Sequence, residues 1–564
     1  MTRRTRRSVL AGLAGLALGG AGPTTGRATA STPPRRAKLP AGATAPDLSG
    51  LETVVDDVLA SRIGDTVAGA TVAVVDGGEV ALANGYGRAD VTDGERMRAA
   101  ETAVRIGSVS KLVTWTAVMQ GVEAGVLDLD TDVNQYLDDS PLSIPDEYDD
   151  PVTLRHLGTH TAGFDVVIES LFDKNPDQLT DLTTTLVRTR PERVRPPGGA
   201  VCYSNWGAML AGHVVAEAFD TTFEEYVQSN VFDPLGMSRS TSRQPVPGDH
   251  PGDLAAPHDT SGEAIERADP VYTGWYPAGS ISATATDMAA FMNAHLGHGT
   301  EAVFNDATLA TMHSEQYGRH PAVNGLRYGF YEHGHPDGDY IGHSGGTIYY
   351  STWLGLLPDR DVGVFVGFNS RGSASPIDVA DEILAECDLL PEGTTPEPAT
   401  GAASRERATT LAGEYESLAS APRNSRLRIL GVLSRLTVEA TDDGGLITRT
   451  MGGESTEWVE TDPYVYHERE GEDVLAADVV DGGVESLYLN SQPTTTFRPV
   501  AAHERQAVTL GTVGGSLAAF GLSLAGWTGL GAWRRLKRRR SGRDEDPAPP
   551  ESGDAAGPAE EGSR

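Results

Sequence analysis

Residues 105–111 read Arg105-Ile106-Gly107-Ser108-Val109-Ser110-Lys111, and an apolar segment with helical periodicity follows them. Lys111 is one of only four lysines in the chain, whereas arginine supplies 41 of the 45 basic residues. An ammonium group can lose its proton when its pKa falls, but a guanidinium group stays charged. A lysine kept in this stretch therefore indicates chemistry that arginine cannot perform.

The spacing of Ser108 and Lys111 predicts that both side chains lie on one face at the start of a helix. A serine hydroxyl is a weak nucleophile until a neighbouring group accepts its proton. The N-terminus of a helix also favours the negative charge that develops there. The pair alone is a weak signal, because a serine helix cap followed by a surface lysine gives the same S-x-x-K pattern. Its interpretation depends on the other motifs.

Two further motifs follow in order along the chain. Tyr203-Ser204-Asn205 comes after the turn at 196–199 and before a helical run, so we expect it on a loop. His343-Ser344-Gly345-Gly346 precedes a strand-like stretch rich in β-branched and aromatic residues. Each motif is weak by itself, since a second Y-x-N occurs at 488–490 and a second H-x-G at 156–158. Their order and context supply the specificity.

Six segments in this order resemble the serine hydrolases related to class C β-lactamases and low-molecular-weight D,D-peptidases. These segments lie at 108–111, 157–163 (Leu-Gly-Thr-His-Thr-Ala-Gly), 197–205, 232–237, 278–288 and 343–346. The resemblance covers residues 48–390, and the catalytic domain is predicted over 47–390. It implies an α/β (α+β) fold of the β-lactamase/transpeptidase type, in which helices flank an antiparallel sheet and a helical subdomain is added.

The resemblance also implies roles for the residues of the first two motifs. Ser108 would be the nucleophile that becomes acylated. Tyr203 would be the general base, with its phenolate stabilised by Lys111. Asn205 would orient Lys111 and contact the substrate. The implied mechanism is formation of an acyl-enzyme followed by its hydrolysis.

In the third motif the resemblance implies that the N–H of Gly346 joins that of Ser108 in an oxyanion hole. His343 and Gly345 would contact the substrate. His343 stands where most β-lactamases have a lysine, and histidine is often neutral near pH 7, which weakens the binding of a substrate carboxylate. We therefore expect a serine hydrolase of small esters or amides.

Two alternatives to this function remain open. D,D-peptidase or β-lactamase activity is the alternative within the family that the motifs resemble. A catalytically silent cell-surface binding protein on the same fold is the alternative from another class. Labelling of Ser108 by a fluorophosphonate separates this second alternative from an enzyme.

The chain is strongly acidic, with 79 acidic and 45 basic residues, a net charge of −34 and a pI near 4.7. Such a surface repels nucleic acid and anionic lipid, so nucleic acid is excluded as a partner. The acid-rich, lysine-poor composition resembles that of proteins from extremely halophilic archaea, because molar salt screens carboxylate repulsion. An ordinary acidic secreted protein is the alternative.

Both ends of the chain predict a location at the cell surface. Residues 1–30 read as an export signal of the twin-arginine type, with Arg6-Arg7 before an apolar stretch, and 31–46 as a linker. The uncharged run 507–533 is long enough for one transmembrane helix. The basic cluster that begins the tail 534–564 predicts a cytoplasmic C-terminus, with the rest of that tail disordered. The catalytic domain is then expected outside the cell, anchored in the membrane.

A second domain is predicted after the catalytic one. The Pro-rich segment 391–404 reads as a linker, and short alternating stretches over 405–500 predict a small antiparallel barrel or sandwich. Cys202 and Cys387 are too few for a disulfide framework and are expected to be unpaired, with a single bridge as the alternative. The i, i+4 pair His156 and His160 lacks the Glu of H-E-x-x-H, so no metal and no cofactor are predicted.

Overall fold

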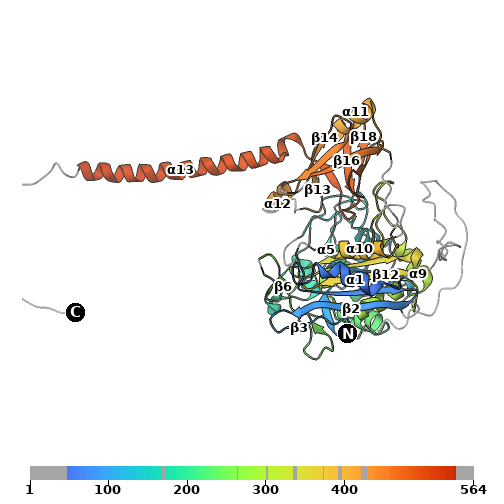
Figure 1. Cartoon of the computed structure of the whole chain (residues 1–564). Coiled ribbons are helices and arrows are strands. Elements are labelled where there is room, and N and C mark those ends of the chain that lie inside the picture. The colour runs from blue at the N-terminus through green and yellow to red at the C-terminus, as the bar shows by residue number, and fades with distance from the viewer. Residues whose placement is uncertain are drawn as a thin grey trace, which may run out of the picture.

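A computed structural model describes residues 48–541 of the chain, apart from 168–171, 263, 300–302, 335–339, 373, 391–396, 421–427, 452 and 454. Figure 1 shows a mixed domain of helices and strands, a β-barrel that follows it in the chain, and a long terminal helix. The predicted export signal at 1–30 and the linker at 31–46 lie outside the described residues, as do residues 391–396 of the linker at 391–404 and residues 542–564 of the predicted tail. The extracellular location therefore stays a prediction.

An antiparallel sheet of seven strands forms the centre of the first domain, in the order β3-β2-β1-β12-β11-β10-β9. The pairing of β1 with β12 brings residue 72 beside residue 366 and so joins the two ends of the domain. The strands are β1 (Gly69–Asp76), β2 (Glu79–Asp90), β3 (Glu95–Arg96), β9 (Tyr331–Glu332), β10 (Ile341–Gly346), β11 (Ser351–Leu357) and β12 (Val362–Phe368).

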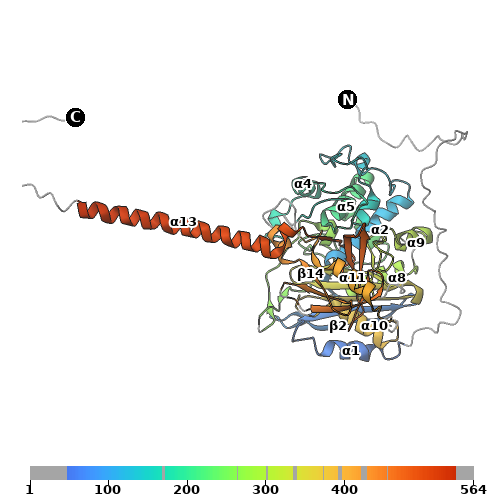
Figure 2. The same cartoon turned by 90° about the horizontal axis from the view of Figure 1, so that it is seen from above.

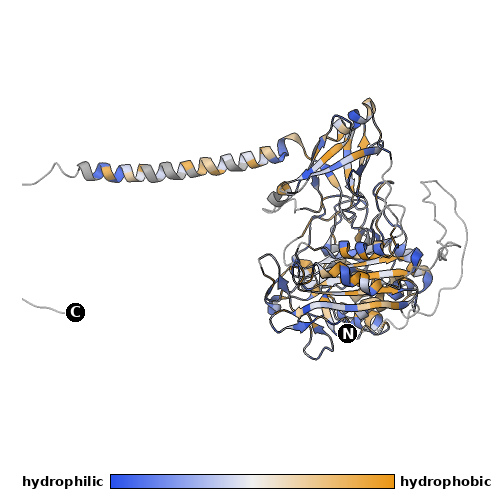
Figure 3. Ribbon diagram, in the orientation of Figure 1, coloured by the Kyte–Doolittle hydropathy of each residue, from blue (hydrophilic) through white to orange (hydrophobic). Residues whose placement is uncertain are grey.

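Strand β1 shows why this sheet lies between two layers of helices. Val72 and Val74 pack in one apolar core, with α1 (Leu51–Ala60) and α10 (Pro376–Glu386), while Ala73 and Val75 pack in the other, with α8 (Ala285–His295). Successive side chains of a strand point to opposite faces, so a strand that is apolar throughout must be covered on both sides. Figure 2 shows α1 and α10 on one side of the sheet and α2 and α5 on the other, and Figure 3 shows the central strands as hydrophobic.

The helical subdomain is built around two buried helices. α2 (Ser110–Glu123) and α5 (Asn205–Phe219) pack against each other, and almost every side chain of α2 is buried. A helix that is buried on all sides is apolar around its circumference rather than amphipathic. Smaller elements surround them: α3 (Leu154–Gly158), α4 (Leu182–Arg188), α6 (Phe223–Val227), α7 (Tyr276–Gly279), α9 (Asp306–His313), β4 (Thr102–Arg105), β5 (Asp253–Leu254), β6 (His258–Asp259), β7 (Glu266–Arg267) and β8 (Ser282–Ala283).

The expected α+β architecture with an antiparallel sheet is confirmed. The long helices α1, α2, α5 and α8 and the long strands β1, β2, β11 and β12 make up this architecture. Hydrophobic periodicity is clear in such long elements because each buries a full face or a full circumference.

The second domain is a closed antiparallel barrel in which each strand pairs with its neighbour in the chain. The turn at 481–482, where Asp481 and Gly482 both have positive φ, joins two strands in a tight hairpin. α11 (Ala402–Leu411) packs its Ala408 and Leu411 into the barrel core. The strands are β13 (Gly413–Ser417), β14 (Leu436–Ala440), β15 (Leu446–Thr450), β16 (Ser455–Asp462), β17 (Val465–Glu468), β18 (Val474–Val480), β19 (Gly483–Leu489) and β20 (Phe497–Pro499).

The predicted transmembrane helix at 507–533 is not supported. This segment is helical, as part of α13 (Gln506–Ser541), which extends away from the barrel in Figures 1 and 2. Over the described residues, no helix combines the length and the hydropathy that crossing a bilayer requires. The prediction counted the length of an uncharged run, but seven of its residues are glycine, which adds little hydropathy.

Neither cysteine is in a disulfide, as expected. Cys202 is buried and Cys387 is half-buried. Without a disulfide framework, the fold depends on its apolar cores.

Candidate active site

The S-x-x-K motif lies on a tight turn that leads into a buried helix. Gly107–Val109 forms a 3-10 turn, and α2 continues from Ser110. Ser108 therefore precedes the α-helix, while Lys111 lies in its first turn. The Nζ atom of Lys111 lies 3.0 Å from the Oγ atom of Ser108, so the structure brings the two side chains together.

Lys111 is enclosed by hydrogen-bond acceptors and only 1 % exposed. Its Nζ lies 2.7 Å from Oδ1 of Asn205 and 2.8 Å from the carbonyl oxygen of Ala278. Burial lowers the pKa of the Lys111 ammonium well below its ordinary value. A neutral amine has two N–H groups and one lone pair. If the N–H groups donate to Asn205 and Ala278, the lone pair is left for the hydroxyl of Ser108.

Tyr203 lies beside this pair, on the residue before the cap of α5. Ser204 caps the helix, its Oγ accepting from the N–H of Gly207 at 2.9 Å. The Nζ of Lys111 lies 4.9 Å from the centre of the Tyr203 ring. Burial raises the pKa of the Tyr203 phenol above its ordinary value, and a hydrogen bond with Ser108 opposes that rise.

The directions of these two pKa shifts bear on the expected phenolate. Both Tyr203 and Lys111 shift toward their neutral forms because each is desolvated. A phenolate stabilised by an ammonium is therefore not favoured as the resting state. Desolvation thus favours a neutral amine and a neutral phenol around the Ser108 hydroxyl.

His343 enters the site from strand β10 and is 3 % exposed. Its ring centre lies 6.1 Å from that of Tyr203 and 5.1 Å from that of Tyr331. Nδ1 lies 2.6 Å from the carbonyl oxygen of Ser344, which can only accept, so Nδ1 carries the proton. Nε2 is buried without a partner in the described part of the chain. Burial lowers the pKa of His343 to about 3, so the ring is neutral at pH 7.

Two glycines let β10 approach the nucleophile turn closely. A Cβ on Gly107 would lie 2.5 Å from the backbone nitrogen of Gly346, and a Cβ on Gly345 would lie 2.0 Å from the carbonyl oxygen of Ile106. Gly107 also has a φ of +53°, which favours glycine. The hydroxyl of Thr352 donates to the Ile106 carbonyl at 2.8 Å and fixes this contact. The backbone nitrogen of Gly346 thus lies beside Gly107, the residue before Ser108.

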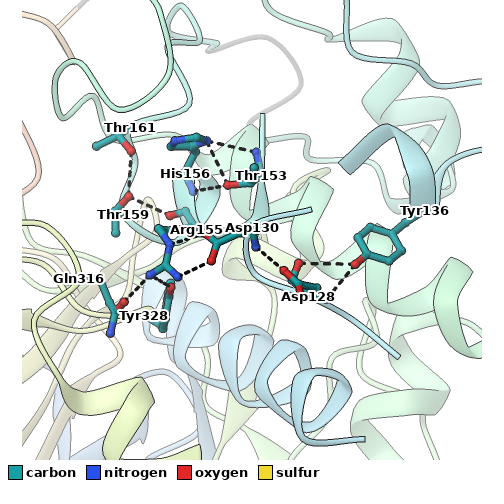
Figure 4. Close-up of polar contacts among 10 residues, drawn as sticks. All are labelled: Asp128, Asp130, Tyr136, Thr153, Arg155, His156, Thr159, Thr161, Gln316 and Tyr328. Carbon is teal, nitrogen blue, oxygen red and sulfur yellow. Dashed lines mark hydrogen bonds and ion pairs between the residues drawn. The ribbon is translucent and has the colours of Figure 1, made fainter. Parts of the chain in front are cut away.

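Figure 4 shows the polar contacts that hold α3 and the 157–163 motif after it. Arg155 binds Asp130 in a two-pronged ion pair, with N–O distances of 2.6 and 2.8 Å. Its Nη1 donates to Oε1 of Gln316 and to the hydroxyl of Tyr328. The hydrogen bond from Arg155 lowers the pKa of Asp130. The network ties the motif to the chain at 316–328.

The two histidines at i, i+4 spacing have different contacts. Nδ1 of His156 accepts from the N–H of Thr153 at 3.2 Å, which caps α3 (Figure 4). His160 lies against Tyr203 with ring centres 4.5 Å apart, and its Nδ1 accepts from the N–H of Ser204 at 3.2 Å. Within the described residues, no group of three His, Cys, Asp or Glu side chains could hold a metal ion.

Sequence reasoning assigned no role at the site to His160. The sequence signal that could have identified His160 is its place in the 157–163 motif. The structure adds that His160 has a φ of +55°. Positive φ in a residue other than glycine is uncommon and marks a backbone held by its surroundings.

The sequence profile of a family described as Beta-lactamase matches residues 55–387. Monacolin J acid methylbutanoyltransferase from Aspergillus terreus is 31% identical over 160 residues, which cover 25% of this chain and 38% of that protein. Protein flp from Staphylococcus aureus (strain MRSA252) is 22% identical over 324 residues, which cover 55% of this chain and 61% of that protein. The chain thus spans between 38% and 61% of the length of these curated relatives.

Solved structures share the fold at low sequence identity. SurE matches with a TM-score of 0.58 and 23% identity, covering 80% of this chain and 98% of its own. The octameric penicillin-binding protein homologue from Pyrococcus abyssi matches with a TM-score of 0.52 and 21% identity, and the match covers 80% of this chain and 100% of that one. EstCE1, a hydrolase with promiscuous acyltransferase activity, matches with a TM-score of 0.52 and 19% identity, and the match covers 61% of this chain and 99% of that one. The first two matches extend beyond the segment that the family profile covers.

Proposed function

The chain belongs to the Beta-lactamase family, and on that basis we propose that it is a serine hydrolase that forms an acyl-enzyme at Ser108 with a small ester or amide. The observation that carries this proposal is the 3.0 Å contact between the Ser108 hydroxyl and the buried amine of Lys111. A desolvated, neutral amine beside a serine is the arrangement that activates a hydroxyl for attack on a carbonyl carbon. The phenol of Tyr203 at the same place supplies a second proton-transfer group.

Acylation begins when the Lys111 amine accepts the proton of the Ser108 hydroxyl. The Ser108 oxygen bonds to the carbonyl carbon of the substrate, and the N–H groups of Ser108 and Gly346 stabilise the oxyanion. As the bond to the leaving group breaks, the Tyr203 phenol donates its proton to the leaving oxygen or nitrogen and regains one from Lys111. A water molecule then gives a proton to the same groups and attacks the acyl carbon. The bond from that carbon to the Ser108 oxygen breaks, the Ser108 oxygen takes the proton back, and the acid is released.

The state of His343 supports a substrate without an essential carboxylate. A neutral ring offers no positive charge to a carboxylate, and its unpaired Nε2 can only accept a hydrogen bond. The site therefore suits an ester or amide with an N–H or O–H donor near the scissile bond. The names of similar proteins, a methylbutanoyltransferase and a hydrolase with promiscuous acyltransferase activity, support acyl transfer as the class of reaction.

Fluorophosphonate labelling of the folded full-length protein at molar salt tests the proposal. We expect the label on Ser108, identified by mass spectrometry of peptides, and no label in Ser108→Ala. Ser110→Ala is a matched control that should keep the label, because the Ser110 hydroxyl accepts from the N–H of Ile281 at 3.2 Å and does not face the reacting centre. An unlabelled wild-type protein would favour the catalytically silent binding protein.

A substrate screen then distinguishes the members of the hydrolase class. Short acyl esters, D-amino-acid amides and a chromogenic cephalosporin should be compared at equal concentration, with Ser108→Ala as the blank. We expect esters and amides to be hydrolysed faster than the cephalosporin, which carries a carboxylate. Cephalosporin hydrolysis at a similar rate would support the β-lactamase alternative instead.

A further inference from the structure

A segment of the β-barrel reaches the residue that carries the catalytic phenol. The chain between β19 and β20 leaves the barrel, and the carbonyl oxygen of Thr494 accepts from the N–H of Tyr203 at 3.0 Å. Cys202 and Thr495 form an antiparallel bridge beside this contact. The thiol of Cys202 donates to the carbonyl of Leu418, also in the barrel domain, at 3.2 Å. The backbone before α5 is thus paired with the barrel.

The backbone at Tyr203 is held from two sides. The N–H of Cys202 donates to the carbonyl of His160 at 2.9 Å, and the N–H of Ser204 donates to Nδ1 of His160 at 3.2 Å. The N–H between them, that of Tyr203, donates to Thr494. His160 therefore holds the two flanking residues, while the barrel holds the middle one. Losing the barrel contact would leave the Tyr203 backbone fixed from one side only.

Arg319 anchors the barrel segment to the first domain. It is 6 % exposed, and its Nη1 lies 3.4, 3.1 and 3.4 Å from the carbonyl oxygens of Leu489, Gln492 and Thr495. Nη2 donates to the carbonyl of Asn324 at 3.1 Å. The Arg319 guanidinium thus binds three carbonyl oxygens of the barrel domain and one of the first domain, to which Arg319 itself belongs. Hydrogen bonds from a charged donor are stronger than neutral ones, more so when they are buried.

Two asparagines add a second attachment beside Arg319. Oδ1 of Asn490 accepts from the N–H of Asn324 at 2.7 Å, and the side-chain amides of both donate to the carbonyl of Gly334, at 2.8 and 3.0 Å. This stretch of the first domain continues into Tyr331, whose hydroxyl lies 2.9 Å from Oγ of Ser344 and accepts from the Ser344 N–H at 2.8 Å. The barrel is therefore attached directly to the motif at 203–205, and through the stretch at 324–334 to the motif at 343–346.

We propose that the β-barrel is a working part of the active site: its 490–496 segment, anchored by Arg319, holds Tyr203 in position for proton transfer with Ser108. Arg319 and Asn490 are then positioning residues, because they act through the backbone of Tyr203 and do not touch the substrate. The proposal rests on the function proposed above. It explains why the segment is built from buried polar contacts rather than as a solvated loop.

The test uses the full-length chain and two independent measurements. Hydrogen exchange of the Tyr203 amide reports the contact with Thr494 whether or not the protein is an enzyme. The rate of fluorophosphonate labelling of Ser108 across a series of pH values reports catalytic geometry. The variants are Arg319→Ala, Arg319→Lys and Asn490→Ala; the last removes one attachment while the barrel core stays intact.

Arg407→Ala is the matched control. Arg407 forms a two-pronged ion pair with Glu460, at 2.7 and 2.8 Å, within the barrel domain and away from Tyr203. Its loss should weaken the barrel without touching the 490–496 segment. The rate of Ser108 labelling in this variant should stay within about twofold of wild type, because residues that are far apart and share no partners usually do not affect each other.

We expect Arg319→Ala to speed exchange at Tyr203, to slow labelling by roughly 10- to 100-fold, and to shift its pH profile, because small misplacements of catalytic groups reduce rates strongly. Arg319→Lys and Asn490→Ala should lie between this variant and wild type. Unchanged labelling despite faster exchange would overturn the proposal and leave the hydrolase intact. If Arg319→Ala and Arg407→Ala slowed the labelling of Ser108 equally, the cause would be general destabilisation of the barrel, and the proposal would be overturned. Unlabelled wild type would refute the proposed function and this proposal together, with the exchange data still reporting docking.

Discussion

Two buried basic side chains, Lys111 at the nucleophile and Arg319 at the barrel contact, show how differently the two regions use positive charge. Burial lowers the pKa of Lys111 well below its ordinary value, whereas Arg319 falls only to about 10 and stays charged at neutral pH. Lys111 lies near two fixed acceptors and one hydroxyl, while Arg319 binds four carbonyls. At these two positions an arginine holds structure and a lysine lies where a proton must move.

The largest effect is expected from Lys111→Arg, which puts a permanently charged guanidinium, like that of Arg319, beside Ser108. A guanidinium cannot give up its proton, so it cannot accept one from Ser108. We expect ester hydrolysis and labelling of Ser108 to fall by roughly 10³-fold or more, as for loss of a general base.

Lys174→Arg is the control for this substitution. Lys174 lies on the surface, 4.0 Å from Asp269, so its charge can be carried by either side chain. Its activity should match wild type. A Lys111→Arg protein that keeps more than about a tenth of the wild-type rate would contradict a proton-accepting role for Lys111.

Tyr203→Phe sharpens the comparison by removing the second proton carrier while keeping the ring. The ring packs against His160, with centres 4.5 Å apart, so the fold should be preserved. Without the phenol, protonation of the leaving group slows, and we expect kcat to fall roughly 10²-fold with KM nearly unchanged. Steady-state kinetics on one ester and one amide check this, and the amide should suffer more because its leaving group is more basic. An unchanged kcat on the amide would show that another group supplies the proton.

Acid should lower the free energy of unfolding of the first domain, because this domain contains buried neutral histidines. Burial lowers the pKa of His295 to about 3, and His313, 3.1 Å from it, is also shifted well below its ordinary value. Below about pH 6.5 the unfolded state binds more protons than the folded one, so stability declines as the pH falls from there toward 3. At about pH 5 the expected loss from His295 is ~2 kcal/mol, and His313 adds to it in the same direction.

Urea unfolding at neutral pH and at about pH 5 measures this loss. The variant His295→Asn should be less stable at neutral pH but should show a weaker dependence on pH, since one titrating group is gone. If the variant keeps the full wild-type pH dependence, the buried histidines are not its source.

The smallest effect is expected from Cys202→Ser, at the boundary of the two regions. The Cys202 thiol is not in a disulfide and donates to the carbonyl of Leu418, and a serine hydroxyl can make the same bond. We expect the free energy of unfolding to change by less than about 1 kcal/mol and ester hydrolysis to stay within about twofold. A much larger loss of activity would mean that the thiol itself takes part in the reaction.

The two regions also differ in how far sequence could predict them. The spacing of Ser108 and Lys111, taken together with the scarcity of lysine and the two later motifs, predicted a contact that the structure places at 3.0 Å. Short motifs on a helix start and on a strand end carry such local information. The barrel was predictable as well, because alternating strands and turns have a clear period.

Contacts between distant segments were not predictable. Nothing in the sequence around Arg319 or Thr494 marks them as neighbours of Tyr203, because backbone carbonyls make the contact and any residue type carries a carbonyl. The expected phenolate of Tyr203 is disfavoured for a related reason: burial sets its pKa, and burial depends on the whole fold. Composition alone also overestimated the membrane propensity of 507–533.

The most direct test of the account is the pH dependence of fluorophosphonate labelling of Ser108 at molar salt. A neutral Lys111 as proton acceptor predicts labelling at pH 7 that rises through an apparent pKa far below the ordinary ~10.4 of a lysine. Labelling that begins only near that ordinary value, or a label that does not attach to Ser108, would contradict it.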